Sequence, residues 1–70
     1  MLLTYRHPEL RLRAFLDTEE GTVELCDEGG PALQYQESRH VGARQYEAAC
    51  VAVAGYAGFS TSPDEWEFLE

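Results

Sequence analysis

One apolar stretch, Ala43–Ala57 with the sequence ARQYEAACVAVAGYA, is the only continuous run long enough to form the centre of a core. Its apolar residues recur with the 3.6-residue period of an amphipathic helix, and its alanines have high helix propensity. Gly58, just after the stretch, is typical of a left-handed helix stop. The alternative is a strand over residues 50–56, because Gly55 would weaken a helix interior. We favour the helix, whose stripe would be Tyr46, Ala49, Cys50, Val53 and Ala57.

Three segments before this stretch alternate apolar and polar residues, which is the period of a half-buried β-strand. They span residues 10–16, 22–26 and 32–36. Each would turn its apolar positions toward the core and its polar positions toward solvent. The residues predicted to face inward are Leu10, Leu12, Ala14, Leu16, Val23, Leu25, Leu33 and Tyr35.

Matching these apolar faces predicts how the strands pair, because a slip of one residue would turn a whole strand over. The first hairpin would place Ala14 opposite Val23 and leave residues 17–20 as its loop. The second would place Val23 opposite Tyr35 and leave residues 28–30 as a glycine-containing loop. Two consecutive hairpins give an antiparallel meander with one face that needs a cover.

The ends of the chain carry weaker signals. Residues 2–6 fit an additional edge strand that ends before Pro8, because proline disfavours helical geometry in the residue before it. Ser38 is a candidate helix N-cap. Residues 62–65, Ser-Pro-Asp-Glu, fit a capping box and predict a short acidic C-terminal helix or tail that carries Trp66 and Leu69.

The predicted fold is therefore α+β. A three-stranded antiparallel β-meander, with the N-terminal edge strand as an optional fourth, is covered by one α-helix. Seventy residues suit one small domain with little material for a deep pocket.

The charge of the chain is strongly negative and unevenly distributed. Thirteen acidic residues oppose five arginines and no lysine, for a formal net charge of −8. Residues 14–37 carry seven acids and no base, and residues 45–70 carry five acids and no base. Such a surface repels nucleic acid and anionic membranes and attracts basic proteins.

No segment has the length and apolarity of a membrane span, and the first residues lack the apolar region of a signal peptide. We therefore expect a cytoplasmic protein. In that compartment two cysteines are more often free thiols than a disulfide.

Chemistry-bearing residues are few. The histidines and cysteines lack the spacing of a zinc site, and Ser38 near His40 lacks the sequence context of a hydrolase nucleophile. We interpret Cys50 as a core residue, Cys26 as a strand end, and both His7 and His40 as surface loop residues. The sequence predicts no cofactor, no metal and no enzymatic activity.

The acidic loops and tail are the strongest functional signal. On a rigid sheet, carboxylates can present negative charge to the lysines and arginines that otherwise bind phosphate, so the protein would act as a nucleic-acid mimic. Trp66 would add an aromatic anchor. The simpler alternatives are solvated loops and a Trp66 that closes the core. The predicted partner-binding residues are Asp17, Glu19, Glu20, Glu24, Asp27, Glu28, Asp64, Glu65, Trp66 and Glu67.

In size, acidity and lack of a catalytic motif, the chain resembles the small proteins with which phages block host nucleic-acid machinery, including anti-CRISPR proteins and polymerase inhibitors. This resemblance is one of composition and assigns no residue. It implies an inhibitor that binds a basic, nucleic-acid-handling target. The alternative hypothesis is a small scaffold or antitoxin-like module in which an exposed edge strand or an apolar helix face pairs with a second copy.

Overall fold

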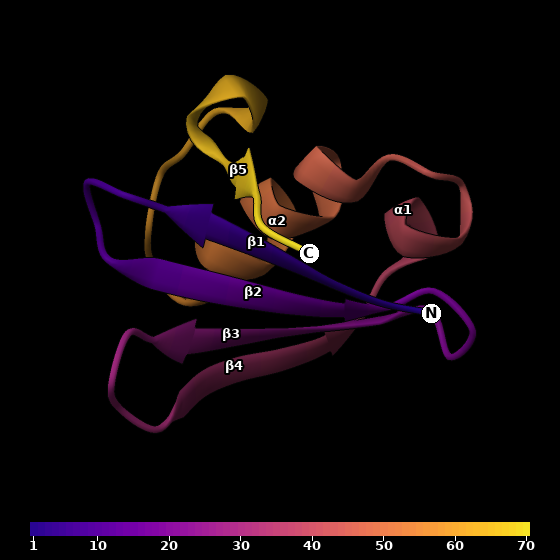
Figure 1. Ribbon diagram of the computed structural model, residues 1–70, viewed down its shortest axis with the longest axis horizontal. Coiled ribbons are helices and arrows are strands. Elements are labelled where there is room, and N and C mark those ends of the chain that lie inside the picture. Colours follow the sequence, from indigo (N-terminus) through magenta and orange to yellow (C-terminus); the bar gives the residue numbers. More distant parts are fainter.

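The computed structural model describes every residue from Met1 to Glu70 and shows an open antiparallel sheet with one main helix on one face (Figure 1). The strand order is β4-β3-β2-β1-β5. The strands are β1 Leu2–His7, β2 Leu12–Asp17, β3 Thr22–Asp27, β4 Ala32–Glu37 and β5 Glu67–Phe68. The helical segments are α1 Arg39–Gly42, α2 Tyr46–Tyr56 and the 3₁₀ turn η1 Pro63–Glu65.

The predicted α+β class is confirmed, but the sheet is larger than predicted. The N-terminal strand β1 is not an edge strand, because the two-residue strand β5 pairs with its outer side. β2 begins at Leu12 rather than at residue 10, since Arg11 adopts a positive φ of 57° in the preceding turn. Leu10 therefore lies in the turn and is exposed, instead of facing the core.

The first predicted hairpin has the correct faces but the wrong register. Leu25, not Val23, lies opposite Ala14, a shift of two residues that preserves the side-chain alternation. The reason is local. The Asp17 carboxylate accepts the backbone N–H groups of Glu19 and Glu20, so the chain turns one residue later than predicted.

The second hairpin differs by a single residue, and this reverses the face of β4. Leu25 pairs with Gln34 and Cys26 with Ala32, so Leu33 is the extra residue of a β-bulge. Leu33 and Tyr35 are consequently 42% and 60% exposed on the face away from the helix. The prediction that these two side chains face inward was wrong.

The predicted helix is confirmed from Tyr46 onward and ends as expected. Residues 39–42 form the separate turn α1, in which Ser38 Oγ accepts the His40 N–H at 3.3 Å. Arg44, at a φ of +62°, separates α1 from α2. At the other end Gly58 has a φ of +94°, and the Phe59 N–H returns to the Ala54 carbonyl at 2.8 Å, which is a Schellman stop.

The core lies between the sheet and α2. The inward-facing side chains of the strands pack against the small residues of α2, and Trp66 covers one end of this core. The predicted C-terminal helix is only the single turn η1, after which the chain pairs with β1 as β5. None of the helices combines the length and apolarity that crossing a bilayer requires. The buried apolar residues are Leu3, Tyr5, Leu12, Ala14, Leu16, Val23, Leu25, Val41, Ala49, Cys50, Val53, Ala54 and Trp66.

Candidate functional site: an acidic hollow at one end of the sheet

A surface hollow lies where β1 turns toward β2, beside η1 and β5. It brings together three segments that are far apart in the sequence: the end of β1 with its turn, the 3₁₀ turn, and the last strand. Pro8 is the one hydrocarbon side chain that lines it, and four of its side chains are carboxylates. The residues of this acidic hollow are His7, Pro8, Glu9, Asp64, Glu65 and Glu67.

Local sequence explains how these residues meet. β1 alternates so that Leu3, Tyr5 and His7 all face inward, and Pro8 then starts the turn that carries Glu9. On the other side, the Glu65 carboxylate accepts the Ser62 backbone N–H, which is half of the predicted capping box.

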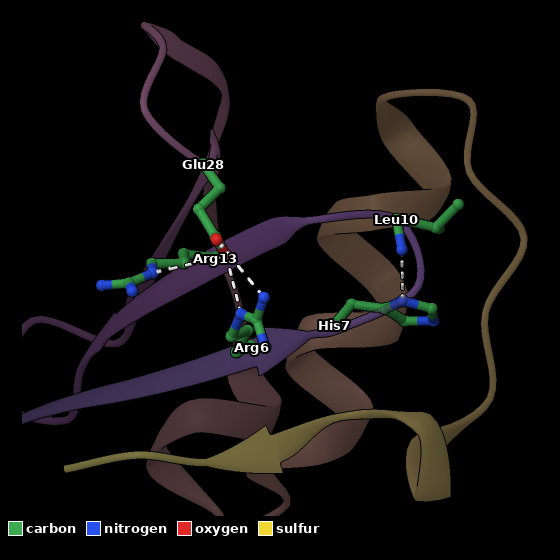
Figure 2. A network of polar contacts seen from close by, with 5 residues as sticks. All are labelled: Arg6, His7, Leu10, Arg13 and Glu28. Carbon is green, nitrogen blue, oxygen red and sulfur yellow. Dashed lines mark hydrogen bonds and ion pairs between the residues drawn. The ribbon is translucent and has the colours of Figure 1, made fainter.

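His7 forms the floor of the hollow and is only 2% exposed, which corrects its interpretation as a surface loop residue. Its Nδ1 accepts the backbone N–H of Leu10 at 3.2 Å (Figure 2). In the neutral ring the proton therefore resides on Nε2. That buried Nε2 has no hydrogen-bond partner and lies 3.7 Å from Glu65 Oε1.

This tautomer limits what the hollow can bind. A metal ion needs a free imidazole lone pair, but the Nδ1 lone pair is occupied and Nε2 carries a proton. In addition, no three His, Cys, Asp or Glu side chains are placed to share an ion. An organic cation that hydrogen-bonds to the carboxylates suits the hollow better, because it requires no lone pair from His7.

The carboxylates of Glu9, Asp64 and Glu67 form no ion pair within the chain, and Glu65 has only the nearby His7. Arg6 is the cross-strand neighbour of Glu67. Arg6 is already bonded to Glu28. Four carboxylates thus line one hollow, and none of them is paired with an arginine.

Glu28 differs from the carboxylates of the hollow, because its charge is paired with arginines of the same chain. Arg6 and Arg13 lie directly opposite one another on neighbouring strands, where two like charges would repel. Glu28 reaches between them: Arg6 Nε donates to it at 2.7 Å, and Arg13 Nε lies 3.8 Å away (Figure 2). The Arg6 hydrogen bond, together with the arginine charges, lowers the pKa of Glu28. Glu28 therefore stabilises the sheet and is not free for a partner.

The other predicted site residues do not join the acidic hollow. Asp17, Glu19 and Glu20 belong to the β2–β3 hairpin at the opposite end of the sheet (Figure 1). Asp17 is bonded to its own loop, and Glu19 lies 3.6 Å from the N-terminal amine. Glu24 is on the open face, where it accepts the Cys26 thiol at 3.5 Å, and Asp27 is exposed at the end of β3. The ten predicted residues therefore do not form one continuous face.

Comparison with protein-family models, with curated proteins and with solved structures finds no match.

Trp66 is a core residue and not an exposed anchor. It is 5% exposed, its Nε1 donates to Thr61 Oγ1 at 3.0 Å, and its ring meets His7 edge-on with centroids 5.3 Å apart. It thereby supports the floor of the acidic hollow from beneath. The aromatic residue that is exposed nearby is Phe68, at 57%.

The two cysteines are free and do not offer a reactive thiolate. Burial raises the pKa of Cys50 to about 12, and burial together with the nearby Glu24 raises the pKa of Cys26. Thiolate is the nucleophilic form of cysteine, so both shifts disfavour thiol chemistry at neutral pH.

Sequence reasoning missed three members of the acidic hollow, His7, Pro8 and Glu9. The alternation of β1 contains the signal for His7, because residues 3, 5 and 7 share a face. For Glu9 there was no signal, since its position beside Asp64 and Glu65 depends on the pairing of β5 with β1.

Proposed function

We propose that the protein is a non-catalytic binding protein that inhibits a basic, nucleic-acid-handling partner by receiving its lysine or arginine side chains in the acidic hollow. The observation that carries this proposal is that four carboxylates, none of them paired with an arginine, line one hollow. An arginine of a partner would supply the donors that these carboxylates lack.

The charge balance of the whole chain supports the same partner class. Among the thirteen carboxylates, Glu28 alone has an arginine partner within the fold. Proteins that bind nucleic acid present lysines and arginines to phosphate, and those side chains accept carboxylates in the same way. A protein bound there would exclude the nucleic acid and so inhibit the partner.

Charge reversal in the acidic hollow should weaken binding of a basic partner. Glu9→Lys/Asp64→Lys replaces two exposed carboxylates with two cations, so partner binding should weaken by about 1–2 kcal/mol, roughly tenfold in affinity. Glu19→Lys/Glu20→Lys is the matched control, because it changes the net charge equally at the opposite end of the sheet. The measurement is recovery of partners from a lysate of the source cells on each immobilised variant.

The proposal expects a partner that is retained by the wild type and by the control but lost by the hollow variant. Duplex DNA or RNA should displace it. So should raising the salt from about 0.1 M to about 1 M, which shortens the screening length from about 10 Å to about 3 Å. A partner that does not bind nucleic acid, or one that the hollow variant retains at high salt, would contradict the proposal.

A further inference from the structure

We propose that β4 is a self-association edge through which two copies of the chain pair antiparallel about Tyr35, joining their sheets into one continuous sheet. This surface is separate from the acidic hollow. β4 lies at one edge of the sheet and β5 at the other, so pairing through β4 leaves the hollows of both copies open (Figure 1).

The backbone of β4 has hydrogen-bonding groups that point out of the sheet. Ser38 N–H donates to the Gly21 carbonyl at 2.8 Å. This bond shows which residues of β4 direct their N–H and C=O groups toward β3 and which direct them away. In an antiparallel ladder the neighbouring position turns its N–H and C=O away from the partner strand. Glu37 and Tyr35 therefore present these groups at the free edge, whereas the opposite edge has only the two residues of β5.

The sequence of β4 does little to protect this edge. Natural edge strands are commonly blocked by lysine, by proline within the strand or by inward-pointing charges. β4 reads ALQYQE, with no lysine, no internal proline and one charge at its end. Its bulge lies at the Leu33 end and leaves the stretch from Gln34 regular.

A second copy can hydrogen-bond to the free N–H and C=O groups of β4 without bringing like charges together. Pairing about Tyr35 sets Tyr35 opposite Tyr35 of the second copy, a favourable aromatic cross-strand pair. It sets Glu37 opposite Leu33 of the second copy, so the two glutamates remain apart. Both Tyr35 and Leu33 are exposed on the open face and would lose solvent contact in the pair.

The charges that border β4 are complementary under the same two-fold axis. Arg39 follows one end of the strand, is exposed and forms no ion pair within the chain. At the other end the exposed Asp27 donates its N–H to the Pro31 carbonyl and also lacks an ion pair. Antiparallel pairing brings Arg39 of each copy toward Asp27 of the other, which favours a second copy over an unrelated strand.

The test is the mass of the purified full chain by sedimentation equilibrium over a range of concentrations. The wild type should associate to a dimer, and Tyr35→Lys should be monomeric because lysine protects the edge. Phe68→Lys is the matched control, since it makes an aromatic-to-lysine change at the other sheet edge and should leave the dimer intact. A wild type that stays monomeric throughout, or a Tyr35→Lys variant that still dimerises, would overturn the proposal.

A charge swap tests the register and does not depend on the Tyr35 variant. Arg39→Asp and Asp27→Arg should each weaken the dimer by about tenfold, because each places like charges together. The double variant Arg39→Asp/Asp27→Arg should recover the wild-type dissociation constant. Failure of the double variant to recover it would contradict the antiparallel register.

Discussion

Trp66→Ala should destabilise the protein by about 3–5 kcal/mol, the usual cost of truncating a buried aromatic side chain. Total stabilities of small domains are about 5–15 kcal/mol, so this one change should remove most of the stability of a domain at the low end of that range. The physical reason is that Trp66 closes the core, contacts His7 and donates its N–H to Thr61. Its loss would also detach η1 and β5 from the rest of the fold.

Urea denaturation followed by far-ultraviolet circular dichroism measures this cost. Trp66→Phe keeps most of the ring but loses the N–H donor, so it should cost about 1 kcal/mol for the hydrogen bond plus a small packing loss. Phe68→Ala, at the exposed neighbouring aromatic, should have a much smaller effect. If Trp66→Ala were as mild as Phe68→Ala, Trp66 would not be part of the core.

Leu25→Ala should cost about 2–5 kcal/mol, whereas Leu33→Ala should change stability by only about 0.5 kcal/mol. Leu25 is fully buried under α2, and Leu33 is the bulged residue on the open face. The two substitutions remove the same atoms from neighbouring strands. Their difference therefore reports which face each side chain occupies.

Denaturation at low protein concentration keeps self-association from adding to the measured stability. Nearly equal costs for the two variants would mean that Leu33 faces the core, as the alternation of the sequence predicts. That outcome would mean that β4 has no bulge at Leu33. The outer edge of β4 would then lack the geometry on which pairing with a second copy depends.

These leucines also show how far the sequence predicts the fold. Alternation identified β2 and β3 with their correct faces, and the apolar period with Gly58 identified α2 and its end. Alternation alone cannot reveal a bulge, because the one inserted residue at Leu33 leaves the pattern of the sequence unchanged while it reverses the strand. The face of β4 was therefore mispredicted.

The site depended on contacts that no local pattern encodes. The acidic residues of η1 and β5 were recognised as a group, but their meeting with Glu9 follows from the pairing of β5 with β1 across most of the chain. The contacts of Glu28, another predicted partner-binding residue, also depend on distant parts of the chain. Its loop folds back onto Arg6 and Arg13, so its charge is compensated within the sheet.

We propose that the uncompensated charge of the acidic hollow recognises basic side chains. The direct measurement is a ¹H–¹⁵N NMR titration of the wild-type chain with an oligo-arginine peptide, with the uncharged oligo-citrulline peptide of equal length as control. We expect the arginine peptide alone to shift the amides of Glu9, Asp64, Glu65 and Glu67. Shifts centred on Glu19 and Glu20, or equal shifts with citrulline, would contradict the account.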